Sequence, residues 1–129
     1  MQPIQSELTI ELLTAESQIA IFRWKGPAVR NNSKEFGCFH DDLLGAIKAG
    51  RILVGLDVCE LTALDSYFIG TVVSSYTEID SAGGELVLIA PVISRASKLF
   101  SLFKSNTVMT VVESLEECLD YFRKRASEL

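Results

Sequence analysis

Hydrophobic and polar residues alternate near the N-terminus, and this pattern predicts that the chain begins with a pair of strands. Residues 7–12 alternate between polar and apolar, and residues 18–24 are apolar and rich in strand-forming side chains, as is typical of strands. A turn over residues 14–17 would join the two strands antiparallel. Gly26-Pro27 is expected to stop the second strand.

After this pair, segments in which apolar residues have helical spacing alternate with short, continuous apolar runs. In the helical segments apolar residues recur every three or four positions, and near-continuous apolar runs between them indicate strands covered on both faces. The polar stretch 30–35 is expected to be a loop or a frayed helix start. The elements expected after it are helix 36–49, strand 52–57, helix 66–81, strand 85–90, helix 94–103, strand 107–112 and a last helix from Ser114, which lies three residues before Glu117 in the pattern of a capping box.

The order of these elements, ββαβαβαβα, predicts the fold class. Strands that alternate with helices imply right-handed parallel crossovers, and the initial hairpin adds one antiparallel strand. We therefore expect an α/β fold, with a small mixed β-sheet flanked by helices. A length of 129 residues suits one domain over residues 1–129, and 48% hydrophobic residues can fill its core without a metal or a disulfide.

Charge and hydropathy exclude several classes of partner. The net charge is −5 and the acidic residues are spread along the chain, so no basic stripe could neutralise nucleic-acid phosphates. No apolar run approaches the roughly 18 to 20 residues of a membrane span, and the N-terminus lacks the basic region and cleavage site of a signal peptide. The protein is expected in the cytoplasm, where Cys38, Cys59 and Cys118 would be reduced thiols that fill the core or its margin.

The sequence contains no recognised catalytic, cofactor or metal motif. No G-x-S-x-G elbow surrounds Ser66, and His40, the single histidine, belongs to a different predicted helix. Neither phosphate-binding glycine pattern is present, and Gly83-Gly84 is read as the turn between a helix and a strand. Cys38-x-His40 offers two ligands without a third nearby, so no metal, cofactor or catalytic residue is expected.

Ser66 stands where a strand is expected to turn into a helix. Functional groups in α/β sheets gather at the carboxyl ends of the parallel strands, and Ser66 is expected at such an end. A serine at a helix N-terminus is exposed, and the free N–H groups there could bind its oxygen or a phosphate. Two interpretations stay open: an ordinary N-cap worth about 1 kcal/mol, or a hydroxyl that is regulated by phosphorylation.

The segments around Ser66 resemble the STAS domain, the fold of bacterial anti-sigma factor antagonists. The central pattern of that family is an apolar strand ending in Leu-Asp-Leu, then an Asp-Ser pair, then Gly-Leu-Gly and an apolar helix. The matching segments here are Leu56-Asp57-Val58, Leu64-Asp65-Ser66 and Phe68-Ile69-Gly70, followed by the run 82–88 with Pro91 and the helix start at 113–119. The resemblance covers roughly residues 7 to 125.

The resemblance implies a non-enzymatic signalling module in transcription regulation. In phosphorylatable members of the family, the serine after that Asp is the phosphoacceptor for a partner serine kinase that doubles as an anti-sigma factor, and by position this residue is Ser66. The partner-binding residues expected around it are Asp57, Asp65, Tyr67, Phe68 and Ser74. Tyr67 and Phe68 stand where many members have small residues, and this bulk is similar to the STAS subunits of stressosomes.

A second interpretation from another class is a STAS module that is never phosphorylated. It would act as a scaffold or binding subunit, docking on a transporter ATPase, on another STAS-containing protein or on copies of itself. Tyr67, Phe68 and the face of Ser74, Ser75 and Glu78 would then form a constitutive interface with exposed aromatic anchors. For the two aromatic residues, ordinary core packing is the alternative.

Overall fold

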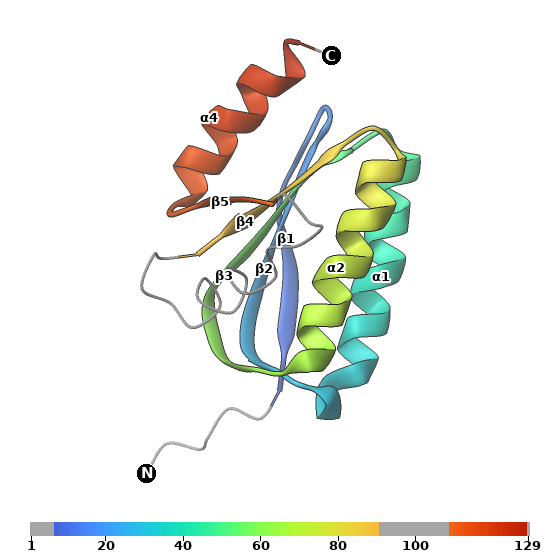
Figure 1. Ribbon diagram of the computed structural model, residues 1–129, viewed down its shortest axis with the longest axis vertical. Helices are drawn as coiled ribbons and strands as arrows, with labels where there is room; N and C mark the ends of the chain where they lie inside the picture. The colour runs from blue at the N-terminus through green and yellow to red at the C-terminus, as the bar shows by residue number, and fades with distance from the viewer. Residues whose placement is uncertain (1–6, 91–108, 129) are drawn as a thin grey trace.

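A five-stranded mixed sheet organises the chain, with α1 and α2 on one face and α4 on the other (Figure 1). The computed structural model describes residues 7–90 and 109–128. The elements are β1 (Thr9–Glu16), β2 (Ile19–Ala28), the 3-10 turn η1 (Arg30–Asn32), α1 (Ser33–Lys48), β3 (Leu53–Leu64), α2 (Ser66–Ser81), β4 (Glu85–Ile89), β5 (Thr110–Val112) and α4 (Leu115–Ala126). The strands lie in the order β1-β2-β3-β4-β5; β1 and β2 pair antiparallel and the other pairs are parallel.

This architecture confirms the predicted α/β class with its mixed sheet and antiparallel hairpin. The helix expected at 94–103 lies outside the described residues, as does the start of the strand expected at 107–112. In the described part of the chain no helix has the length and the apolar character needed to cross a membrane.

Alternation along β3 divides the interior into two cores. Val54, Leu56 and Val58 face α1 and α2, whereas Leu53 faces α4 together with residues of β2 and β4. The first core is centred on Trp24, whose ring lies 5.4 Å from Phe36, 4.9 Å from Phe39 and 5.2 Å from Phe68 between centroids. These inclined aromatic pairs hold the N-terminal halves of α1 and α2 on β2.

Three strands run further than the sequence predicts. β1 continues past residue 12 to Glu16, so the turn expected over residues 14–17 is confined to Ser17 and Gln18. Gly26-Pro27 does not stop β2, which continues to Ala28, and β3 continues seven residues past Asp57 to Leu64. The extension is a parallel pairing in which Pro27 lies opposite Ala63 and Ala28 opposite Leu64. Proline is tolerated because the register shifts beside it and β1 has already ended its pairing at Lys25. The helix expected from residue 36 begins at Ser33, after η1.

The turn from α2 into β4 needs its two glycines. Gly83 adopts a φ of +82°, which side chains rarely allow. A Cβ on Gly84 would lie 2.0 Å from the carbonyl oxygen of Ile52, and that same oxygen accepts a hydrogen bond from the N–H of Glu85 (3.0 Å). The predicted role of Gly83-Gly84 as a helix-to-strand turn is confirmed, and close backbone approach explains why the second position is glycine.

Helix α4 begins as predicted, with Ser114 as its N-cap. The Ser114 hydroxyl accepts a hydrogen bond from the N–H of Glu117 (3.2 Å), and the Glu117 carboxylate accepts one from the N–H of Glu113 (3.4 Å) instead of Ser114. The capping box is therefore present with its return bond shifted by one residue. Further along the helix, Tyr121 and Arg125 both donate to Glu85 and tie α4 to β4.

The cysteines do not all belong to the core. Cys118 is buried on the inner face of α4, as expected, but Cys38 and Cys59 are exposed, so the expectation that all three thiols fill the core or its margin is wrong for these two. The Cys59 thiol donates to the carbonyl of Ile89 (3.6 Å). Desolvation, followed by a hydrogen bond and repulsion from Asp57, raises the pKa of Cys59 to about 11.

This difference predicts an order of alkylation. At pH 8 only about one Cys59 side chain in a thousand is a thiolate, because its pKa is about 11. We therefore expect iodoacetamide to modify the exposed Cys38 at least about tenfold faster than Cys59, with Cys118 protected until unfolding. Peptide mass spectrometry over a time course measures the three rates, and protein in urea provides the control. Equal rates for Cys38 and Cys59 in the native protein contradict the expectation.

Candidate functional site

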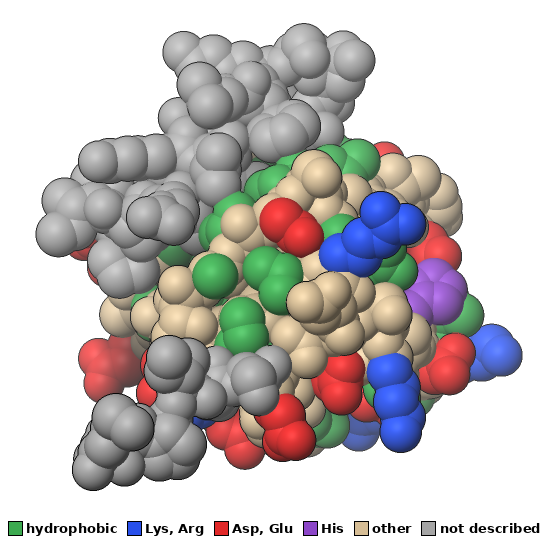
Figure 2. Space-filling model, turned by 90° about the horizontal axis from the view of Figure 1, so that it is seen from below, with side chains coloured by type: hydrophobic (Ala, Val, Ile, Leu, Met, Phe, Trp, Pro, Cys, Tyr) green, Lys and Arg blue, Asp and Glu red, His purple; other side chains and the backbone are tan. Residues whose placement is uncertain are grey.

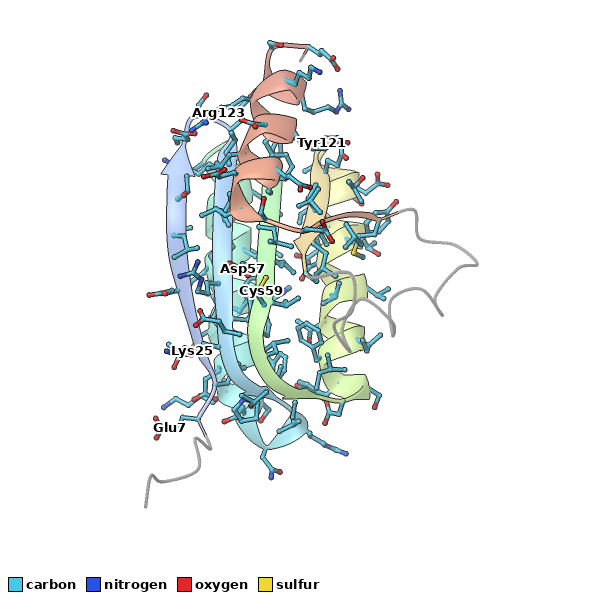
Figure 3. All side chains as sticks on the ribbon, turned by 90° about the vertical axis from the view of Figure 1, so that its left-hand side faces the viewer. Glu7, Lys25, Asp57, Cys59, Tyr121 and Arg123 are labelled. Atoms are coloured by element: carbon cyan, nitrogen blue, oxygen red, sulfur yellow. The ribbon has the colours of Figure 1, made fainter. Side chains whose placement is uncertain are left out.

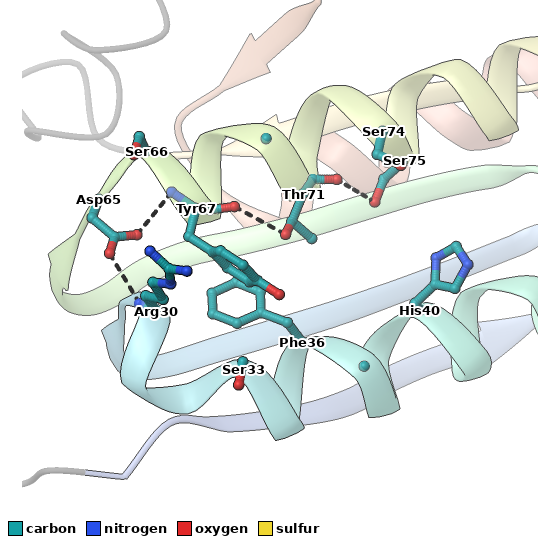
Figure 4. A pocket seen from close by; sticks show the side chains of 12 residues that line it. Arg30, Ser33, Phe36, His40, Asp65, Ser66, Tyr67, Thr71, Ser74 and Ser75 are labelled. Atoms are coloured by element: carbon teal, nitrogen blue, oxygen red, sulfur yellow. Dashed lines mark hydrogen bonds between the residues drawn. The ribbon is translucent and has the colours of Figure 1, made fainter.

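Ser66 lies at the carboxyl end of β3, where the chain turns into α2 (Figure 4). β3 ends at Leu64, Asp65 precedes the helix in an extended conformation, and Ser66 is the first helical residue. The Ser66 side chain is exposed, and its hydroxyl has no hydrogen-bond partner among the described residues. The hydroxyl is thus open to solvent at the position that the sequence analysis gave it.

Asp65, and not Ser66, caps α2. One oxygen of its carboxylate accepts from the N–H groups of Tyr67 (3.0 Å) and Phe68 (3.3 Å), and the other accepts from the N–H of Arg30 (2.9 Å). The interpretation of Ser66 as an ordinary N-cap is therefore wrong: a carboxylate already satisfies the amide groups that the serine would have served. Asp65 also joins the start of η1 to the start of α2.

The stability of the helix should accordingly depend on Asp65. We expect Asp65→Ala to lower the free energy of unfolding by about 1–2 kcal/mol, because the cap and the bond from Arg30 are lost together. Ser66→Ala should change it by no more than about 0.5 kcal/mol. Urea unfolding followed by circular dichroism measures both. Asp65→Asn, which keeps one acceptor oxygen, should fall between them; an equal cost for Ser66→Ala and Asp65→Ala would contradict this assignment.

A groove of about 630 Å³ opens between α1 and α2 next to Ser66. Its surface is rich in hydroxyl groups, with Arg30 at the end where α2 begins and His40 further along α1 (Figure 4). His40 lies 3.7 Å from Glu78 and makes no hydrogen bond to Ser66. The lining residues are Arg30, Ser33, Phe36, Gly37, His40, Asp65, Ser66, Tyr67, Gly70, Thr71, Ser74 and Ser75.

Four of the predicted site residues meet at this groove. Asp65, Ser66, Tyr67 and Ser74 all line it. The Tyr67 side chain is 41% exposed and packs edge-on against Phe36, with ring centroids 4.9 Å apart. An aromatic ring held in place while one side faces solvent is suited to contact with a partner.

Phe68 does not take part in this surface. Its side chain is fully buried against Trp24, so the expectation of an exposed aromatic anchor at this position is wrong. The apolar spacing of α2 explains the result, because Phe68 shares the buried face with Ile69 and Val72. Phe68 supports the first turn of α2 from beneath.

Asp57 lies away from the groove, on the sheet face that carries α4 (Figure 3). Its side chain is buried: one oxygen lies 3.2 Å from Nε of Arg23 and the other accepts from the N–H of Cys59 (3.1 Å). Arg23 also lies 3.4 Å from Glu60. These contacts fall where the β2–β3 register shifts between Arg23 and Lys25, so Asp57 holds the irregular part of the sheet together and does not present a carboxylate beside Ser66.

Arg30 is the residue of this site that the sequence analysis missed. The sequence predicts a loop or a frayed helix start at residues 30–35, and no motif distinguishes Arg30 from its neighbours. Its position next to Asp65 depends on β2 continuing to Ala28 beside the end of β3, which brings residues 35 positions apart into contact. No group of three or more His, Cys, Asp or Glu side chains gathers to hold a metal in the regions 7–90 and 109–128.

The hairpin, the parallel strands and the strand-to-helix turn at Ser66 occur together in the STAS fold, which confirms the fold that the sequence resemblance implies. The anti-sigma factor antagonist SpoIIAA in its unphosphorylated form has a similar structure, with a TM-score of 0.70, 18% identity, and 89% of this chain and 98% of that chain covered.

The Bacillus cell fate determinant SpoIIAA in its phosphorylated form gives a TM-score of 0.70 at 20% identity, covering 89% of this chain and 100% of that chain. A protein from Shewanella loihica with a SpoIIAA-like fold gives a TM-score of 0.60 at 14% identity, covering 94% and 98%. No family model and no curated protein matches the sequence. These similarities define the fold.

Proposed function

We propose that this protein is a non-catalytic, cytoplasmic signalling module that binds a partner serine kinase or anti-sigma factor and is switched by phosphorylation of Ser66. The observation that carries the proposal is the Ser66 hydroxyl, which is exposed and without a hydrogen-bond partner among the described residues at the rim of the α1–α2 groove. The similar SpoIIAA has been solved in an unphosphorylated and a phosphorylated form, which supports a switch on this fold.

The chemistry requires only an accessible hydroxyl from this protein. The partner kinase transfers the γ-phosphoryl group of ATP to Ser66 Oγ: the new P–O bond forms, ADP leaves, and a base of the kinase takes the hydroxyl proton. The product carries about −1.5 to −2 charge next to the Asp65 carboxylate. A partner that docks over the neutral hydroxyl then meets two negative groups that it must desolvate, and it is released.

The surface that the partner would contact follows from the groove. Asp65, Tyr67 and Ser74 lie around Ser66 and are proposed to bind the partner directly. Phe68 and Asp57 are buried, so their part in binding is to hold α2 and β3 in position. Because Tyr67 is 41% exposed, it is the proposed aromatic anchor of this interface.

The intact mass of the protein purified from its own host tests the proposal. A fraction heavier by one phosphate, removed by phosphatase and mapped to Ser66, is the expected result. The Ser66→Ala variant should lack that fraction, whereas Ser33→Ala, which removes another exposed hydroxyl of the same groove, should keep it. Phosphate absent under every growth condition, or found only at another residue, contradicts the switch.

The exposed ring of Tyr67 also favours a second candidate, a scaffold module that is never phosphorylated. It would bind another STAS-containing protein, a transporter ATPase or a second copy of this chain through the same groove. An unmodified protein that still retains a partner in a pull-down from its native cytosol would favour this candidate. The class of the retained protein, kinase or STAS assembly, then separates the two.

A further inference from the structure

Arg30 projects its guanidinium group toward the first turn of α2. The backbone at this residue is fixed, since the Arg30 N–H donates to Asp65 Oδ2 (2.9 Å). The side chain is exposed and lines the groove together with Ser66, and Figure 4 shows it directed toward Asp65 and Tyr67. Figure 2 views this end of the molecule and shows basic and acidic side chains lying beside one another on it.

The helix N-terminus does not supply the counter-charge for a phosphate on Ser66. The N–H groups of Tyr67 and Phe68, which would otherwise face such an anion, already donate to the Asp65 carboxylate. That carboxylate would itself repel the phosphate. A phosphate at this position therefore needs a cation from elsewhere in the groove.

Arg30 is suited to be that cation. Of the residues that line the groove, the charged or titratable ones are Arg30, Asp65, His40 and Tyr67, and His40 lies near Glu78, further along the helices. The Arg30 guanidinium forms no ion pair with any of the described residues, so no existing contact has to be broken. Its planar fork of N–H groups can bind two phosphate oxygens at once.

We propose that Arg30 is the phosphate receiver of this protein: once Ser66 is phosphorylated, the Arg30 guanidinium binds the phosphate and forms a second link between η1 and the first turn of α2. This inference rests on the proposed function and deepens it. Phosphorylation would then have two electrostatic effects on the groove. It adds negative charge at Ser66, and it neutralises Arg30, which can then no longer pair with an acidic group of the partner.

The test uses full-length protein with phosphoserine inserted at position 66 during translation, so that no kinase is needed. The phosphate is titrated by ³¹P NMR in the parent, in Arg30→Gln, in Arg30→Lys and in Lys34→Gln. Lys34 is an exposed cation of α1 that does not line the groove, so its variant removes the same charge from a nearby surface. Circular dichroism of each variant verifies folding.

Loss of a cation that binds the phosphate dianion should raise the pKa at which that dianion takes up a proton to become the monoanion. We expect a rise of roughly 0.5 unit or more for Arg30→Gln, at most about 0.2 for Lys34→Gln, and an intermediate value for Arg30→Lys. A titration unchanged by Arg30→Gln, or changed equally by Lys34→Gln, overturns the assignment.

The two proposals fail separately. Because the phosphoserine is inserted during translation, a phosphate pKa that does not change in Arg30→Gln rules out Arg30 as the receiver and leaves the proposed Ser66 switch untouched. The absence of phosphate from the protein of the host removes the switch and leaves the titration result standing.

Discussion

Replacing Ser66 with Asp is expected to weaken binding to the proposed partner, a serine kinase or anti-sigma factor, and replacing it with Ala is expected to leave the complex permanently formed. Almost complete release requires a difference in affinity of about 10⁴-fold, or roughly 5.5 kcal/mol. A phosphate of about −1.5 to −2 charge at a dry interface can approach this value, whereas a carboxylate has one charge and fewer oxygens. We therefore expect Ser66→Asp to weaken binding by about 10²-fold, measured by calorimetry with the partner recovered by pull-down.

The structure offers a close control for this prediction. Thr77 is exposed on α2 and does not line the groove, so Thr77→Asp adds the same charge to the same helix away from Asp65 and Arg30. Its effect should be about threefold or less, since exposed charges are screened over such distances. Because Asp65 provides the cap, both Ser66 variants should unfold at nearly the parent concentration of urea. Parent-like binding by Ser66→Asp and Ser66→Ala contradicts the switch.

Periodicity predicted the elements whose boundaries depend on their own sequence. Helix α2 spans Ser66–Ser81, the expected residues, because its apolar spacing begins after a capping Asp and ends at a glycine pair. The C-terminal half of β3 was missed because the predicted strand ended at Asp57, where the continuous apolar run stops, although residues 59–63 alternate between apolar and polar side chains. This segment pairs in parallel with Gly26, Pro27 and Ala28, and the identity of that partner strand could not be read from the local pattern.

The residues of the candidate site likewise fall into those that a local motif predicts and those that depend on pairing between strands. The Asp-Ser pair could be found because a local motif carries it, and its exposure follows from its place at a helix start. Asp57 and Asp65 look alike in the sequence, since each directly follows a leucine, but Arg23 on the neighbouring strand pairs with Asp57, which lies buried within β3. Arg30 reaches the site only through the extended β2–β3 pairing. Contacts between neighbouring strands therefore decided which charged residues surround Ser66.

Phe68→Ala is expected to cause the largest loss of stability near the site, about 3–5 kcal/mol, although its neighbour Tyr67 lies on the surface. The Phe68 side chain is fully buried and packs against Trp24 with centroids 5.2 Å apart, so its removal leaves a cavity between α2 and β2. Urea unfolding followed by the fluorescence of Trp24, the single tryptophan, measures the loss at the affected place.

Tyr67→Ala tests whether a residue beside Ser66 contributes to partner binding without contributing much to stability. Tyr67 is 41% exposed, so its removal should cost no more than about 1 kcal/mol of stability while weakening partner binding by about tenfold or more, as for an aromatic anchor. A Phe68→Leu variant, which refills most of the cavity, should recover much of the stability lost in Phe68→Ala. If instead Tyr67→Ala unfolded the protein as readily as Phe68→Ala, the first turn of α2 would depend on its outer ring as much as on its inner one, and Tyr67 could not be assigned to the partner.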